Sequence, residues 1–299
     1  MRTWPLLLIM GLSLSLSACK DEKPQAESTP AAALPEEAEQ APAEQAPRLV
    51  TLTPAVTETV FALGLGEQVV AADASSTYPA DAEKVATLPY FRQLAVEPLL
   101  ALKPDQIVTG PGAGPPPALD QLRATGVEFL TFEDATSLES AKERVTKIAA
   151  SLGADPKPLL AKMDADIEKA KAAPEVEAKV LHIYARGQKI IMAGGPDTAA
   201  GDLIALTGAE VVPKDFEGFK PLTAEAVIAA APDVIVMGES GVQSMGGEDS
   251  VFEIPGVAQT PAGKAKRLVL VNDQLMVFGP RSGQAVFELK TKIAEALKK

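Results

Sequence analysis

The stretch LAVEPLLALKPDQIVTG, residues 94–110, returns in altered form as LTAEAVIAAAPDVIVMG at residues 222–238. Eight of the seventeen positions are identical at a constant offset of 128 residues. Each copy has the pattern of a helical segment, a Pro-Asp turn and a short apolar strand. Residues 61–64 and 204–208 also match, at a similar offset and in the same order. The repeat therefore predicts two lobes of one α/β design.

The residues around both copies alternate between short apolar strands and helical patterns. Short apolar strands that alternate with helices are typical of parallel sheets covered on both faces. Strands are expected at 48–53, 69–72, 106–109 and 127–132, and the pattern restarts at 179–184. We predict an α/β fold of two Rossmann-like lobes with parallel sheets, and a ligand cleft between them where the strands end.

A helical spacer separates the two predicted lobes. An apolar stripe with helical spacing runs from Leu138 to Leu152, and a second helical pattern begins after Pro156. Thr136 and Glu139 form a candidate capping box at the start of the spacer. A long helical connection transmits position rigidly, so only modest closure of the lobes is expected. The predicted segments are an N-terminal lobe at 48–135, a linker at 136–174 and a C-terminal lobe at 175–299.

The first nineteen residues have the features of a lipoprotein signal peptide. An apolar stretch, too short to span a bilayer permanently, ends in Leu16-Ser-Ala-Cys19. That ending resembles a bacterial lipobox, so Cys19 is predicted to be the lipidated first residue of the mature protein. Residues 20–47 hold eight Ala, five Pro and a net charge of −5, which predicts a disordered tether. We expect a membrane-anchored protein outside the cytoplasm.

The composition of the 299 residues argues against several classes of function. The net charge of −12 argues against nucleic-acid binding, which normally needs a basic surface. A single Cys rules out a disulfide framework, and a single His disfavours His-rich metal sites and Ser-His-Asp hydrolases. Three prolines follow the glycine-rich loop Gly110–Gly114 and lack the N–H donors of a phosphate-binding loop. An enzyme that uses this loop is the most distant alternative, and no catalytic residue is predicted.

Several motifs resemble the periplasmic haem-binding proteins of bacterial ABC haem importers. The resembling residues run through most of 48–299 and include 56–64, 76–79, 241–247 and 278–281. The general two-lobe motifs fit binding proteins for haem, cobalamin or ferric siderophores alike, whereas Tyr90-Phe-Arg-Gln-Leu94 and Thr260-Pro-Ala-Gly263 are more specific to haem. The resemblance implies that haem b is the transported ligand and that Tyr90 ligates its iron. It also implies a periplasmic monomer that delivers haem to an ABC permease with its ATPase. Cobalamin or a ferric siderophore stays as the alternative cargo.

The chemistry of a phenol independently suits Tyr90 to ferric iron. A phenolate is a hard anionic ligand of the kind that binds Fe(III) in tyrosine-ligated haem proteins. Ionising a phenol of pKa about 10 at pH 7 costs about 4 kcal/mol, which iron and a neighbouring cation can supply. Arg92 is the nearest candidate cation in the sequence, and it is equally suited to pairing with a haem propionate.

Other candidate ligand contacts come from the second lobe. The family often has an arginine near the iron ligand at the position of Ser240, and Arg186 or Arg281 is expected to compensate for its absence. Met245 is a candidate pocket residue and equally a core residue. His182 lies inside a predicted strand, so a buried, hydrogen-bonded histidine is expected there rather than an axial ligand.

Two glutamates occupy equivalent places in the repeated segments. Glu97 and Glu225 each fall at the start of a predicted helix, where the helix dipole favours a carboxylate. These helix starts are expected at the edge of the cleft, so the two acids form a symmetric pair. In ABC importers such a pair on the binding protein docks to arginines of the permease, and this role is expected for Glu97 and Glu225.

Overall fold

The structure is a computed structural model that describes residues 46–299. The predicted signal peptide, the lipidation site Cys19 and the tether as far as residue 45 lie outside the described residues. No helix within residues 46–299 is long and apolar enough to cross a membrane.

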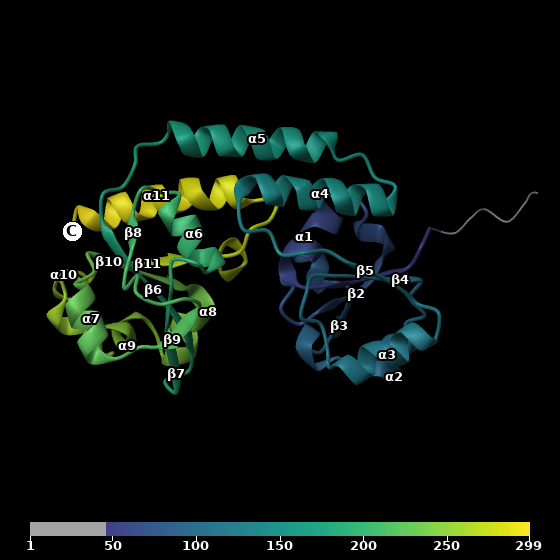
Figure 1. Cartoon of the computed structure of the whole chain (residues 1–299), viewed down its shortest axis with the longest axis horizontal. Coiled ribbons are helices and arrows are strands. Elements are labelled where there is room, and N and C mark those ends of the chain that lie inside the picture. The colour runs from purple at the N-terminus through teal and green to yellow at the C-terminus, as the bar shows by residue number, and fades with distance from the viewer. Residues whose placement is uncertain (1–45) are drawn as a thin grey trace, which may run out of the picture. The chain divides into compact units, whose positions relative to one another are not determined.

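The first sheet is built from five parallel strands in the order β3-β2-β1-β4-β5. Figure 1 shows this sheet with helices above and below it. The apolar central strand β1 is buried at every position, because helices cover both faces of the sheet. The strand order reverses at β1, which places a crevice at the carboxyl ends of β1 and its neighbours. The strands are β1 (Leu49–Leu52), β2 (Val69–Asp73), β3 (Ala86–Leu88), β4 (Gln106–Thr109) and β5 (Glu128–Thr131), and the helices are α1 (Pro54–Ala62), α2 (Val96–Ala101) and α3 (Pro116–Ala124).

The second sheet is mixed, whereas a parallel sheet was expected. Its order is β11-β10-β6-β7-β9, with the short β8 also paired to β6. Strand β7 runs antiparallel to β6, and β9 runs antiparallel to β7. The reason is a tight turn at 187–189, where Gly187 has φ +61° and sends the chain straight back. The strands are β6 (Lys179–Arg186), β7 (Ile190–Gly194), β8 (Glu210–Val211), β9 (Phe219–Pro221), β10 (Val234–Gly238) and β11 (Leu268–Val271).

The internal repeat corresponds to equivalent elements of the two sheets. The first copy forms α2 and β4, and the second forms α7 (Ala224–Ala230) and β10. Strand β4 lies between β1 and β5, as β10 lies between β6 and β11. The two lobes thus share one local design, as the repeat predicted. The other helices of the second lobe are α6 (Ala199–Ala205), α8 (Glu239–Met245), α9 (Glu248–Phe252), α10 (Pro261–Lys264) and α11 (Ser282–Leu297).

The spacer consists of two helices, α4 (Leu138–Leu152) and α5 (Lys157–Ala172). The capping box at the start of α4 is formed by Ser137 and Ser140, so the predicted pair Thr136 and Glu139 was wrong. Ser137 takes the capping role because its backbone is extended and its side-chain oxygen accepts from the Ser140 N–H. The predicted lobe boundaries at 135 and 175 stay predictions, since residues 46–299 form one unit.

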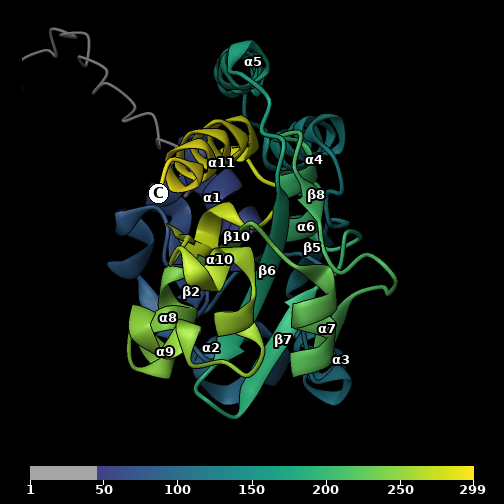
Figure 2. The ribbon, with the colours of Figure 1, turned by 90° about the vertical axis from the view of Figure 1, so that its left-hand side faces the viewer.

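Helix α4 connects the two hydrophobic cores. Its Ile148 packs with Val56 and Val60 of α1, whereas its Val145 belongs to the core around β6 and α11. Helix α11 runs beside α5 (Figure 2), and the Lys290 ammonium donates hydrogen bonds to the carbonyls of Ala170 and Ala173. Because α4 contributes to both cores, a change in the relative position of the lobes has to disturb packed side chains.

Candidate functional site

A cleft of about 730 Å³ lies where the strands of both sheets end. Its walls come from the loops after β1, β2 and β3 on one side and from β6, α6 and the segment 273–278 on the other. Arg144 of α4 and the adjoining residues 134–136 complete the lining. A cavity of this size, lined by both lobes, is typical of a site for a small molecule or cofactor.

Asp73, at the end of β2, organises the first-lobe edge of the cleft. Its carboxylate is buried and accepts hydrogen bonds from the Thr53 N–H at 2.9 Å, the Ser75 N–H at 3.0 Å and the Ser76 hydroxyl at 2.7 Å. Thr53 has φ +74°, an uncommon conformation for a β-branched residue that is found at ligand-binding sites. Sequence reasoning missed Asp73, although its position directly after an apolar strand could have drawn attention to it.

Tyr90 lies in a loop that is fixed by backbone hydrogen bonds. It follows β3 and precedes a short 3-10 helix, Phe91–Gln93, whose Gln93 N–H donates to the Tyr90 carbonyl at 2.7 Å. The Leu94 N–H donates to the Gly114 carbonyl, and the Gly114 N–H donates to the Phe91 carbonyl. The Gly110–Gly114 loop therefore supports the Tyr90 loop, which is a structural role for the glycines that suggested a phosphate site. Tyr90 is partly buried, with its ring 4.5 Å from that of Phe91.

Arg186 of the second lobe meets Tyr90 of the first lobe in the cleft. Its guanidinium carbon lies 5.8 Å from the centre of the Tyr90 ring and 5.9 Å from that of Tyr184. Arg92 also lines the cleft, and its guanidinium lies 5.1 Å from the Phe91 ring. The structure thus brings Tyr90, Arg92 and Arg186 to one cavity.

Tyr184 is a cleft residue that sequence reasoning missed. It precedes Arg186 by two positions on β6, so both side chains point to the same face of the strand. Its ring is partly exposed and packs against the edge of Phe219 at 5.6 Å. Strand alternation around Arg186 was the signal that could have identified it.

Three other residues named from the sequence have different surroundings. Met245 is buried in the core beneath the second sheet with Leu181 and Met237, and it does not line the cleft. Arg281 lies behind the cleft wall, where it pairs with Glu58. Ser240 lines the cleft at the start of α8, and its hydroxyl and N–H both donate to the Asp273 carboxylate.

Burial changes the acidity of several groups that line the cleft. It raises the pKa of the Asp134 carboxyl, against the opposing effect of Arg144, and it also raises the pKa of Asp202, with a further contribution from Asp197. It lowers the pKa of the Arg144 guanidinium. Partial burial thus makes both carboxyls weaker acids, although the Asp134 side chain is still 73% exposed. Within the described part of the chain, no three His, Cys, Asp or Glu side chains gather to hold a metal ion.

The match to known proteins extends through most of these elements. Residues 49–275 match the family model described as periplasmic binding protein. The chain belongs to this family. The structure of the periplasmic heme-binding protein RhuT from Roseiflexus sp. is 35% identical, with a TM-score of 0.79 over 84% of this chain and 99% of RhuT. This likeness confirms the predicted fold class of two α/β lobes joined by helices.

Two relatives of this binding protein differ in the role that their names give them. The vitamin B12-binding protein of Yersinia pestis is 31% identical over 229 residues, which is 72% of this chain and 76% of the relative. The uncharacterized ABC transporter substrate-binding lipoprotein YvrC of Bacillus subtilis is 29% identical over 258 residues, which is 84% of this chain and 79% of YvrC.

Glu97 and Glu225 occupy equivalent positions in the binding protein. Each is exposed and lies in the first turn of its helix, Glu97 in α2 and Glu225 in α7. Helix α7 is capped by the Thr223 hydroxyl, which accepts from the Ala226 N–H at 3.3 Å. Neither carboxylate takes part in an ion pair among residues 46–299, so both are free to meet a partner.

His182 is buried in β6 as expected, but it makes no hydrogen bond to any residue of 46–299, contrary to the expectation. Its Nδ1 atom faces Gly194, where a Cβ atom would come within 2.3 Å, and has no partner. The ring borders a side cavity of about 290 Å³ that shares Tyr184 and Asp273 with the main cleft. Burial lowers the pKa of His182 to about 4, so the side chain is neutral at pH 7.

This depressed pKa makes the stability of the protein pH-dependent. The unfolded chain binds a proton at His182 near pH 6.5, whereas the folded protein binds it only near pH 4. We expect about 3 kcal/mol of the free energy of unfolding to be lost as the pH falls across this window. Urea unfolding of the wild type and of His182→Phe at pH 7.5 and pH 4 measures it. Between the two pH values, the free energy of unfolding should fall by about 3 kcal/mol less in the variant than in the wild type. Equal decreases in both proteins would contradict the lowered pKa of His182.

Proposed function

We propose that this protein is an extracytoplasmic substrate-binding lipoprotein that captures haem b in the cleft and delivers it to an ABC permease and its ATPase. The observation that carries the proposal is the meeting of Tyr90 and Arg186, from opposite lobes, in a cavity of about 730 Å³. The family and the relatives named above support a transport role rather than an enzymatic one. The lipid anchor on Cys19 is part of the proposal, and the similarity to YvrC, which is named as a lipoprotein, supports it.

In this proposal the Tyr90 phenolate is the protein ligand of the ferric iron. A phenolate is a hard anion suited to Fe(III), and a nearby cation favours the ionised form. We assign this part to Arg186, and its guanidinium carbon, 5.8 Å from the centre of the Tyr90 ring, supports the assignment. Arg92 is then available for a haem propionate, since it lines the same cavity without an ion pair among the described side chains.

Cobalamin is the second candidate cargo, favoured by the relative described as a vitamin B12-binding protein. A corrin that carries its own axial ligands needs no phenolate from the protein. A ferric siderophore likewise surrounds its iron completely. A role for Tyr90 in iron ligation therefore distinguishes haem from both alternatives.

A titration of the purified protein tests the choice of cargo. Ferric haem and cyanocobalamin are added separately to the full chain, and absorption and tryptic protection are followed. We expect haem to bind with a saturating change in the Soret band and with tyrosinate-to-iron charge-transfer bands. Tight binding of cyanocobalamin without any haem complex would overturn the proposal in favour of the second candidate.

Arg186 is expected to slow the release of haem. Arg186→Met keeps a long apolar side chain but removes the cation near Tyr90, which weakens the interaction with a phenolate. We expect haem transfer to excess apomyoglobin to become about tenfold faster, equivalent to about 1.4 kcal/mol. Arg123→Met removes an exposed arginine far from the cleft lining and should leave the rate unchanged. An Arg186 variant that releases haem at the wild-type rate would refute this role.

A further inference from the structure

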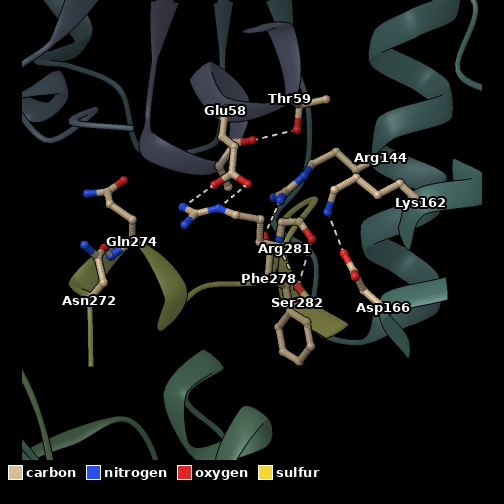
Figure 3. Close-up of polar contacts among 12 residues, drawn as sticks. Glu58, Thr59, Arg144, Lys162, Asp166, Asn272, Gln274, Phe278, Arg281 and Ser282 are labelled. Atoms are coloured by element: carbon tan, nitrogen blue, oxygen red, sulfur yellow. Dashed lines mark hydrogen bonds and ion pairs between the residues drawn. The ribbon is translucent and has the colours of Figure 1, made fainter. Parts of the chain in front are cut away.

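A buried ion pair connects the two lobes behind the cleft. Glu58 lies in α1 of the first lobe, and Arg281 lies directly before α11 in the second half of the chain. Arg281 Nε donates to Glu58 Oε1 at 2.8 Å, and Nη2 donates to Oε2 at 2.9 Å (Figure 3). The two side chains are only 12% and 6% exposed. A bidentate pair of this kind fixes direction as well as distance.

Two further contacts hold the residues directly before α11. One comes from the first lobe and the other from the linker helix α4. The guanidinium carbon of Arg281 lies 3.4 Å from the centre of the Tyr78 ring, in the loop after β2. Arg144 of α4 donates a hydrogen bond to the backbone carbonyl of Phe278 (Figure 3). The charge of Glu58 also favours the protonated form of Arg144. The same buried carboxylate therefore interacts with both Arg281 and Arg144.

Segment 273–281 carries part of the cleft wall as well as Arg281. Asp273, Gln274, Val277 and Phe278 line the cavity. At the other end of the segment, Gln274 Nε2 donates to the Ser75 carbonyl of the first lobe at 2.8 Å. The second lobe is therefore attached to the first on both sides of the cleft wall.

The contact between Tyr90 and Arg186 depends on how the lobes are placed. Tyr90 is fixed within the first lobe by its loop, and Arg186 is fixed within the second by β6. Nothing within either lobe sets the distance of 5.8 Å between them. We propose that Glu58 and Arg281 are positioning residues that hold the lobes so that Arg186 meets Tyr90 at the bound cargo. This inference rests on the proposed haem-binding function.

A positioning role of the Glu58–Arg281 pair has consequences that a merely stabilising role does not have. If the pair acts through Arg186, its disruption accelerates haem release only while Arg186 is present. It leaves the Tyr90-to-iron bond itself in place, because Tyr90 belongs to a separately fixed loop. A pair that only stabilises the fold changes neither the release rate of the folded protein nor the relative position of the lobes.

Arg281→Lys is the sharpest variant, because it keeps the charge and removes the two-point attachment. Spin labels at Gln121→Cys in α3 and Ala229→Cys in α7, in a Cys19→Ser background, report the distance between the lobes without ligand. We expect a broader or shifted distance distribution and about tenfold faster release of ferric haem, with the charge-transfer bands retained. Arg123→Lys, the same change at an exposed arginine, is the matched control.

A double-variant cycle completes the test. Arg281→Lys combined with Arg186→Met should release haem no faster than Arg186→Met alone, because both changes remove the same interaction. Additive acceleration in the double variant would overturn the proposal, as would a wild-type distance distribution in folded Arg281→Lys. Glu58→Gln serves for the same measurements if Arg281→Lys does not fold. Failure of the wild type to bind haem would overturn the proposed function, whereas the lobe distances would still decide whether the pair positions the lobes.

Discussion

Tyr90→Phe should abolish the tyrosinate-to-iron charge-transfer bands and weaken haem binding by about 100-fold or more. The change removes one oxygen and leaves the ring that packs against Phe91 at 4.5 Å. Loss of a ligand to the iron costs at least as much as loss of a group that orients a ligand, which already amounts to about 10–100-fold. Because the ring contacts persist, the free energy of unfolding should change little. Visible spectra measure the loss of the charge-transfer bands, and equilibrium titration with ferric haem measures the loss of affinity.

Tyr184→Phe provides the matched control for this prediction. Tyr184 faces the same cleft and lies a similar distance from Arg186, but it belongs to the opposite lobe. Its phenol is not the proposed ligand, so the bands should remain and the affinity should change by less than about tenfold. Bands that survive in Tyr90→Phe and disappear in Tyr184→Phe would move the iron ligand to the second lobe.

Reversing the charge at both Glu97 and Glu225 should abolish transport while leaving haem binding intact. Each carboxylate is exposed at a helix start outside the cleft lining, so Glu97→Lys with Glu225→Lys does not alter the cavity. Charge complementarity governs docking, and a like charge opposite a permease arginine is strongly unfavourable. We expect haem-dependent growth or uptake to fall at least about tenfold in cells that carry the double variant.

A second double variant controls for the change in net charge. Glu139→Lys with Glu248→Lys reverses two exposed glutamates that also lie in first helical turns, in α4 and α9. Each Lys at such a position costs about 0.3–1 kcal/mol through the helix dipole, so both double variants should lose comparable stability. Equal uptake by the two double variants, whether normal or reduced, would remove the docking role from Glu97 and Glu225.

Local patterns in the sequence were sufficient for the architecture. The repeated segments at 94–110 and 222–238 correspond to equivalent helix–strand units, because apolar periodicity and Pro-Asp turns act over a few residues. The pattern was insufficient at β7, where the turn at Gly187 makes an antiparallel hairpin. At the start of the spacer, the cap belongs to Ser137 rather than Thr136. Such one-residue choices depend on backbone angles that composition alone does not specify.

The sequence by itself determined the two-lobe α/β fold and the helical spacer, and the motif at 90–94 singled out Tyr90. Only the tertiary structure decided that Arg186, rather than Arg281, meets Tyr90, that Tyr184 lines the cleft, and that the Asp73 carboxylate holds the lining residues Thr53 and Ser75. It also decided that Arg281 pairs with Glu58 across 223 residues of chain. The physical reason is that secondary structure follows from neighbours in the sequence. A contact between lobes depends instead on how two separately folded surfaces pack, which no local pattern encodes.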